Sequence, residues 1–130
     1  MFQGLEKEYQ SFVTVFDSES KNYFAQKKDQ DSQLSLIWES MSYTFFLDGK
    51  RFRPFLIYLI AHSYGIHIKK IINYALAIEM IHTYSLIHDD LPCMDNDDFR
   101  RGKSSNHKVF GEDIALLAGD ALLTESLGLV

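Results

Sequence analysis

The chain has 130 residues, of which 46% are hydrophobic, and a formal net charge of -5. This length and apolar content suit one helical domain with a buried core, and the acidic balance without a basic stripe argues against a nucleic-acid partner. With no apolar stretch long enough to span a bilayer, no signal-like N-terminus and the single cysteine Cys93, we expect a protein with no transmembrane segment in a reducing, cytoplasmic compartment.

Helical periodicity predicts two amphipathic helices in the first part of the chain. Apolar residues recur at helical spacing from Phe2 to about Lys28, with fraying expected near Asp17, and again from about Gln33 to Leu47. Neither segment carries a recognisable chemical motif. We interpret the first as a packing or subunit-contact helix and the second as mostly core.

Three cations gather at the break that follows, in the sequence Asp-Gly-Lys-Arg-Phe-Arg-Pro at positions 48–54. We expect Gly49 to end the preceding helix with a positive φ and Pro54 to lie in the first turn of the next. Free backbone N–H groups at a helix start favour an anion, so the cations there point to an anion site. Alone this is a weak signal, because exposed cations usually face only water.

Two further helices are predicted next. Residues 55–61 are apolar nearly all round, so we expect this helix, which ends near Gly65, to be central. After a basic hinge at 69–70, a longer helix runs from Ile71 to Asp90. This second helix delivers the acidic residues that follow.

The stretch from His82 to Gly102 contains five aspartates and two adjacent arginines. Desolvated carboxylates need compensation, and Mg²⁺ is the hard cation that takes one or two carboxylates together with substrate phosphates and water. Arginine adds planar donors for phosphate oxygens. The stretch therefore predicts a site for a magnesium-bound polyphosphate. The alternative is a solvated acidic loop paired with its own arginines.

Asp89 and Asp95 pose a geometrical problem for that site. Six residues on an ideal helix place them about 120° apart, which is too divergent for one metal cluster. Pro92 removes a helical hydrogen bond and should kink, bulge or stop the helix. We predict that the chain bends there and returns Asp95 to the same ions as Asp89.

The remainder reads as a polar loop at 96–110, followed by a helix with small residues from Gly111 to Leu123. An EF-hand that starts at Asp97 is excluded, because its twelfth position is Lys108 where a glutamate is needed.

The order of these residues resembles the trans-isoprenyl diphosphate synthase family over about Asp48 to Leu123. The family's first aspartate-rich motif is matched by Asp89, Asp90, Asp95, Arg100, Arg101 and Gly102, and its Gly-Lys-Arg-x-Arg-Pro element by residues 49–54. The resemblance implies an all-α fold, an antiparallel helical bundle of the isoprenoid synthase type. Members are longer and carry a second aspartate-rich motif that this chain lacks. We therefore expect residues 1–130 to be a single helical domain, the N-terminal part of a homodimeric enzyme, and impaired alone.

The resemblance also implies a role for each matched residue. The reaction is Mg²⁺-dependent head-to-tail condensation of isopentenyl diphosphate with an allylic diphosphate, dimethylallyl or geranyl. The implied catalytic residues are Asp89, Asp90, Asp95, Arg100 and Arg101, with Asp89 and Asp95 as metal ligands. The implied substrate-binding residues are Lys50, Arg53, His82 and Arg101 for isopentenyl diphosphate and Arg100 for the allylic diphosphate.

Residues about one turn before the first aspartate set product length in this family. Tyr84 is bulky and Ser85 beside it is small, which resembles farnesyl-length synthases, while the wider sequence at 93–98 also resembles geranylgeranyl synthases. We predict farnesyl diphosphate as the product. The alternatives are a geranylgeranyl diphosphate synthase, a catalytically silent helical subunit or fragment, and a terpene cyclase, in which the basic element at 49–54 has no clear use.

Overall fold

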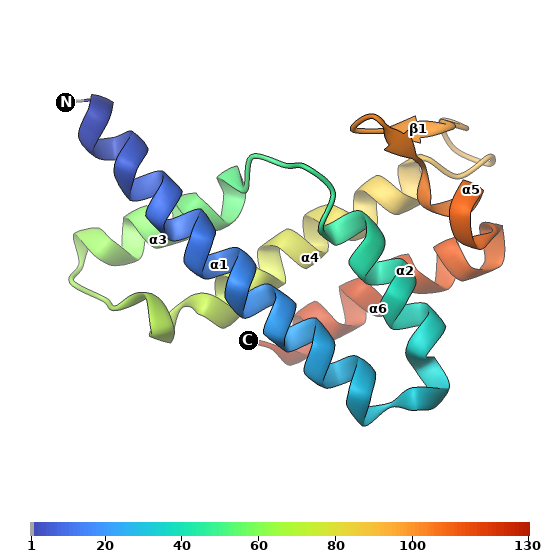
Figure 1. Cartoon of the computed structure of the whole chain (residues 1–130), viewed down its shortest axis with the longest axis horizontal. Coiled ribbons are helices and arrows are strands. Elements are labelled where there is room, and N and C mark those ends of the chain that lie inside the picture. The colour runs from blue at the N-terminus through green and yellow to red at the C-terminus, as the bar shows by residue number, and fades with distance from the viewer. Residues whose placement is uncertain (1) are drawn as a thin grey trace.

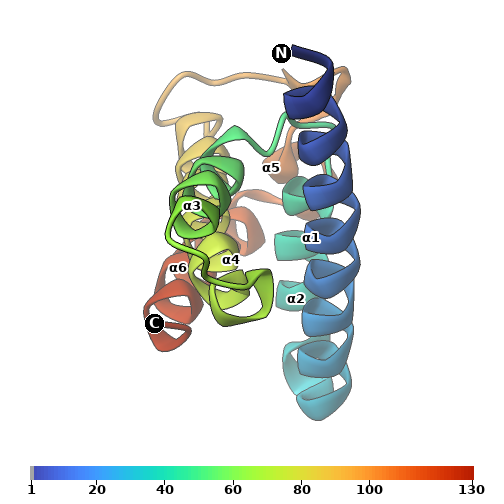
Figure 2. The same cartoon turned by 90° about the vertical axis from the view of Figure 1, so that its left-hand side faces the viewer.

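The computed structural model describes residues 2–130, and its helices lie in two layers. Figures 1 and 2 show α1 and α2 antiparallel and side by side, with α3, α4 and α6 on the other side. In chain order the elements are α1 (Phe2–Gln30), η1 (Ser32–Leu34), α2 (Ser35–Phe45), α3 (Phe52–Ser63), η2 (Ile68–Lys70), α4 (Ile72–Asp89), β1 (Phe99–Arg100), β2 (Lys103–Ser104), α5 (Asn106–Phe110) and α6 (Glu112–Gly128). The predicted all-α antiparallel bundle is confirmed. Across residues 2–130, no helix has the length and apolar character needed to cross a bilayer.

The core between the layers is largely aromatic on the α1 side. Phe12, Phe16 and Phe24 recur at multiples of four residues and are all buried, so they form one stripe along α1. Phe24 packs against Phe45 of α2, with ring centroids 4.9 Å apart. This buried stripe keeps α1 helical through Asp17, where fraying was wrongly expected.

The helix α3 is peripheral, and the prediction that it would be central is wrong. Only Pro54, Phe55 and Ala61 of this helix are buried, whereas Phe52 and Ile60 are 59% and 62% exposed. The central position belongs to α4, which packs against both α3 and α6. An apolar run occurs both in helices covered on one face and in helices covered on several faces. The sequence pattern therefore could not distinguish a peripheral α3 from a central one.

Glycine ends α3 as expected, but it does not end α2. Gly65 has a φ of +69° and donates to the His62 carbonyl, while the Ile66 N–H donates to the Ala61 carbonyl, both at 2.9 Å. This is the Schellman arrangement. By contrast α2 already ends at Phe45, and the positive φ in the turn that follows falls on Arg51.

Candidate functional site

A cleft of about 420 Å³ collects basic residues from three separate segments. Lys50 comes from the turn before α3, Arg53 from the first turn of α3, His82 from α4, and Arg101 from the tip of the β1–β2 hairpin. These four residues are the ones to which the family resemblance assigns a single diphosphate ligand. The structure brings all four to one cleft, although their binding roles stay predictions.

Arg51 lies between two cleft cations but is itself buried. Its Nε donates to Asp17 Oδ1 and its Nη1 to Glu79 Oε1, each at 3.1 Å. Its guanidinium also lies over the Phe45 ring, 5.3 Å from the centroid. The charge of Arg51 is therefore compensated inside the protein, which corrects the expectation of three similar cations at this helix start.

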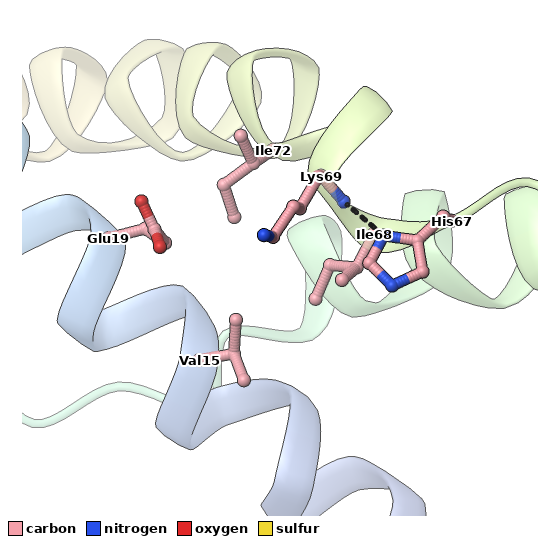
Figure 3. A pocket seen from close by; sticks show the side chains of 6 residues that line it. All are labelled: Val15, Glu19, His67, Ile68, Lys69 and Ile72. Carbon is pink, nitrogen blue, oxygen red and sulfur yellow. Dashed lines mark hydrogen bonds between the residues drawn. The ribbon is translucent and has the colours of Figure 1, made fainter.

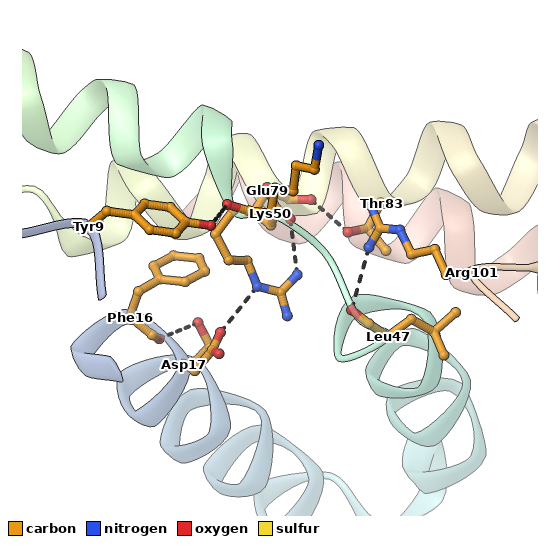
Figure 4. Close-up of polar contacts among 10 residues, drawn as sticks. Tyr9, Phe16, Asp17, Leu47, Lys50, Glu79, Thr83 and Arg101 are labelled. Atoms are coloured by element: carbon orange, nitrogen blue, oxygen red, sulfur yellow. Dashed lines mark hydrogen bonds and ion pairs between the residues drawn. The ribbon is translucent and has the colours of Figure 1, made fainter. Parts of the chain in front are cut away.

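Glu79 was not among the site residues predicted from the sequence. It is a buried carboxylate in an apolar run of α4, three residues before His82, and it lines the cleft. The signal was available, because a glutamate inside an apolar helical run is rarely buried without a partner. Figure 4 shows Glu79 and Asp17 with the neighbouring polar contacts of the cleft.

Arg101 reaches the cleft because of the hairpin that carries it. Arg100 pairs with Lys103, and the two turn residues Arg101 and Gly102 have φ values of +51° and +76°. Positive φ at both positions is typical of a type I′ hairpin turn. The sequence predicted only a polar loop here, so the hairpin is a correction.

The structure leaves no room for a side chain at position 49. A Cβ atom built on Gly49 would overlap the Arg101 guanidinium. The Nη1 of Arg101 also lies 3.4 Å from the Leu47 carbonyl oxygen, a long contact that is drawn in Figure 4. Gly49 does not have the positive φ that was expected of it.

Polar contacts with α2 hold the hairpin in place. The Tyr43 hydroxyl donates to the Ser104 carbonyl at 2.8 Å. The buried amide of Asn106 donates to the Ser40 carbonyl and to Thr44 Oγ1, both at 2.9 Å, and accepts from Ser40 Oγ at 2.7 Å. These bonds satisfy a buried amide and fix the chain directly after β2.

His82 lies in a positive environment. Partial burial lowers its pKa, and the nearby Arg53 guanidinium lowers it further; Glu79 opposes this, and Arg101 adds to the lowering. The imidazole is therefore neutral near pH 7. A neutral ring offers one N–H donor and one acceptor, so His82 can donate a hydrogen bond to an anion without carrying charge.

Asp90 is buried and paired with Arg100. The Nε and Nη2 of Arg100 donate to its two oxygens at 2.7 and 2.8 Å, a bidentate geometry that raises the pKa of Arg100. Asp89, in contrast, is exposed. The adjacent aspartates thus differ: one joins β1 to the end of α4, and the other faces solvent.

The chain folds back after α4, as the proline predicted. The helix ends at Asp89, before Pro92, and the Asp95 N–H donates to the Asp89 carbonyl at 2.9 Å. Two exposed carboxylate residues are therefore joined by a backbone hydrogen bond, and hard oxygen donors of this kind fit Mg²⁺. Within residues 2–130, no three His, Cys, Asp or Glu side chains form a ready-made metal cluster. Mg²⁺ commonly takes only one or two carboxylates and completes its shell with water and phosphate.

The two residues predicted to govern product length lie on α4 and are half-buried. The Tyr84 ring meets the His88 ring edge-on, with centroids 5.7 Å apart and planes at 83°. His88 in turn fits against Gly119 of α6, where a Cβ atom would overlap its imidazole. Ser85 donates to the backbone of its own helix at 2.7 Å.

A second, larger cavity of about 570 Å³ opens between α1 and η2 (Figure 3). Its lining mixes apolar residues such as Ile68 and Ile72 with Glu19 and Lys69. None of the residues predicted from the sequence to act on a ligand lines it.

Comparison with known proteins places these observations in a family. A family model described as "Polyprenyl synthetase" matches residues 35–130. The chain is 53% identical over 114 residues to the farnesyl diphosphate synthase of Bacillus subtilis, covering 80% of this chain and 38% of that enzyme. It is 60% identical over 87 residues to the chloroplastic geranylgeranyl pyrophosphate synthase of Catharanthus roseus, covering 67% of this chain and 24% of that one.

Solved structures agree with these sequence matches. A geranyltranstransferase from Thermotoga maritima superposes with a TM-score of 0.79 at 40% identity, covering 89% of this chain and 43% of that one. An FPP/GFPP synthase from Zymomonas mobilis gives a TM-score of 0.83 at 35% identity, covering 94% and 44%. The chain thus spans less than half the length of each of these four relatives.

Proposed function

The chain belongs to the polyprenyl synthetase family, and from that premise we propose that its protein is a prenyltransferase of isoprenoid biosynthesis. The proposed reaction is head-to-tail condensation of isopentenyl diphosphate with dimethylallyl or geranyl diphosphate, giving farnesyl diphosphate. The observation that carries the proposal is the convergence of Lys50, Arg53, His82 and Arg101 on one cleft. Three positive charges and a neutral histidine donor suit a diphosphate.

The cleft residues bind and orient the isopentenyl diphosphate in this proposal. Arg100, whose Nε and Nη2 are held by Asp90, holds the allylic diphosphate near the end of α4. The allylic carbon–oxygen bond breaks, and the electron pair leaves with the diphosphate. The double bond of isopentenyl diphosphate then forms the new carbon–carbon bond, and the released diphosphate accepts the proton that is lost. Catalysis consists of orientation and charge stabilisation.

Asp89 and Asp95 are the residues that would hold Mg²⁺, because both carboxylates are exposed and their backbones are hydrogen-bonded. A Mg²⁺ ion bound there would supply positive charge that favours departure of the diphosphate. Asp90 contributes indirectly, since its carboxylate is occupied by Arg100. The cytoplasmic location and the homodimer implied by the resemblance stay predictions.

Tyr84 supports the farnesyl product. Its ring lies five positions before Asp89 and packs edge-on against His88. A bulky group at this point would limit the growing chain. The second candidate is a geranylgeranyl diphosphate synthase, which the similarity to the Catharanthus enzyme favours.

The test is an assay with labelled isopentenyl diphosphate and geranyl diphosphate, run with this chain and with any longer protein that its gene encodes. We expect a Mg²⁺-dependent C15 product from the longer protein and little or none from this chain alone. Lys50→Met and Arg53→Met should raise the KM for isopentenyl diphosphate more than that for geranyl diphosphate. The exposed Lys21 of α1 provides a matched control as Lys21→Met. Equal effects on both KM values would contradict the assignment of the cleft.

A further inference from the structure

Arg51 occupies an unusual position in the cleft wall. It has a φ of +46°, in the left-handed region that side chains rarely adopt, and it directly precedes α3. Its neighbours Lys50 and Phe52 are exposed, whereas Arg51 is only 5% exposed. The backbone therefore turns sharply at the residue between the two cations of the cleft.

Three elements hold Arg51 in this conformation. Asp17 comes from α1, Glu79 from α4, and the Phe45 ring from the end of α2. One residue earlier, the Lys50 carbonyl accepts a hydrogen bond from the Tyr9 hydroxyl, which Figure 4 shows. The turn is thus attached to the rest of the fold at two consecutive residues.

This attachment determines where the cleft cations can lie. Lys50 and Arg53 are both exposed and form no ion pair within residues 2–130, so their position follows from the backbone that carries them. A binding group is effective when its supporting residues keep it close to the productive geometry. Since Arg51 supports that backbone and does not itself face solvent, it is suited to act on the ligand through its neighbours.

We propose that Arg51 is a positioning residue for diphosphate binding. Its buried pairing with Glu79 and Asp17 fixes the turn so that Lys50 and Arg53 face the same anion. This inference rests on the proposed function, because it concerns the same diphosphate site. It differs from a purely structural role in one respect: the affinity for the anion should depend on Arg51 even when stability does not.

The experiment measures binding of inorganic pyrophosphate to the 130-residue chain by calorimetry, without divalent cations, alongside thermal unfolding. Arg51→Met alone leaves Glu79 buried without its partner and should lower the Tm. The double variant Arg51→Met/Glu79→Gln keeps the net charge and removes both buried charges, so its Tm should recover. We expect its pyrophosphate Kd to stay about tenfold higher than that of the unchanged chain, which equals about 1.4 kcal/mol.

The dependence of the pyrophosphate Kd on salt concentration distinguishes a loss of positioning from a loss of charge in the cleft. Screening weakens each contact between the anion and a cation, so Lys50→Met should flatten the dependence of Kd on salt. The double variant keeps Lys50, Arg53 and Arg101 and should retain the original slope with a weaker Kd. Arg51→Lys keeps the charge but cannot donate to Asp17 and Glu79 with a planar guanidinium, so it should also bind pyrophosphate more weakly. This variant tests the inference if the methionine variants do not fold.

Two results would overturn the inference. If the folded double variant, or a folded Arg51→Lys chain, binds pyrophosphate as tightly as the unchanged chain, Arg51 is structural only. If the unchanged chain does not bind pyrophosphate, or if Lys50→Met binds it equally well, the proposed diphosphate site is wrong. The inference about Arg51 is then wrong as well.

Discussion

The guanidinium of Arg101 rests on the backbone of Gly49, so that the hairpin tip and the turn before α3 meet with no room for a side chain between them. Gly49→Ala should therefore displace Arg101 from the cleft. The backbone of Gly49 does not have a positive φ, so alanine fits there without backbone strain and stability should change little. We expect pyrophosphate affinity to fall about tenfold, the value of one charge-assisted hydrogen bond.

Calorimetry on Gly49→Ala, paired with thermal unfolding, checks this expectation. The matched control is Gly4→Ala in α1, where an added Cβ meets nothing within 4 Å. An unchanged pyrophosphate affinity in Gly49→Ala would mean that binding does not require the Arg101 guanidinium to lie against Gly49.

Substitution of Asp89 and of Asp90, the adjacent aspartates at the end of α4, should change the free energy of unfolding by different amounts. Asp90→Asn breaks a buried bidentate pair and leaves the Arg100 charge without its partner, so the free energy of unfolding should fall by about 3 kcal/mol. Asp89→Asn alters an exposed carboxylate and should change stability by no more than about 0.5 kcal/mol. Urea unfolding of the two single variants provides the comparison, and equal losses would contradict the assigned difference.

His82 should make the chain less stable in mild acid. Its pKa in the folded chain is lowered by burial and by Arg53, so below the ordinary histidine value of 6.5 the unfolded chain binds more protons. Its contribution is therefore complete above that value and is lost as the pH falls toward the lowered one. His82→Gln should reduce the loss of unfolding free energy between pH 7 and about pH 5.5.

The control for the substitution itself is Lys21→Gln, which places the same side chain at an exposed position of α1 and is unfolded at the same two pH values. Proton NMR of the His82 ring gives a direct readout, and added pyrophosphate should raise its pKa by placing negative charge beside it. A midpoint at or above the ordinary value in the free chain would rule out this account.

Gly119 should be intolerant of alanine despite lying inside a helix. Alanine is normally about 1 kcal/mol more favourable than glycine in a helix interior. Here the added Cβ would strike the His88 imidazole, so Gly119→Ala should destabilise the chain by about 1–3 kcal/mol. Removing the obstacle in Gly119→Ala/His88→Ala should restore part of that loss in denaturant unfolding. A gain of stability in the single variant would contradict this account, because it would show that the His88 imidazole moves aside without cost.

Local signals explain what the sequence could predict. Helical spacing indicated α1, α2 and α4, Gly65 marked the end of α3, and Pro92 marked the point where the chain folds back. Each of these depends on residues within a few positions of one another. The family resemblance also named the four residues that line the cleft together, while their binding roles stay predictions.

Long-range contacts explain what the sequence could not predict. Whether Arg51 or Arg53 faces the cleft depends on Asp17 and Glu79, which lie 34 and 28 positions away from Arg51. The purpose of Gly49 is visible only once the hairpin tip is placed against it. The exposure of α3 likewise depends on which helices pack against it, and this cannot be deduced from the residues of α3 alone.

Arg51 and Arg101 are two of the three non-glycine residues with a positive φ in the stretch 2–130. Glycine or asparagine would suit both backbones better, but neither has a guanidinium to contribute. Arg51 is retained by its buried pairing with Asp17 and Glu79, whereas Arg101 forms no ion pair within residues 2–130. Selection for heat tolerance alone should therefore tend to replace Arg101 and so remove one cation from the cleft. At this position stability and ligand binding favour different residues, and the chain carries the one that favours binding.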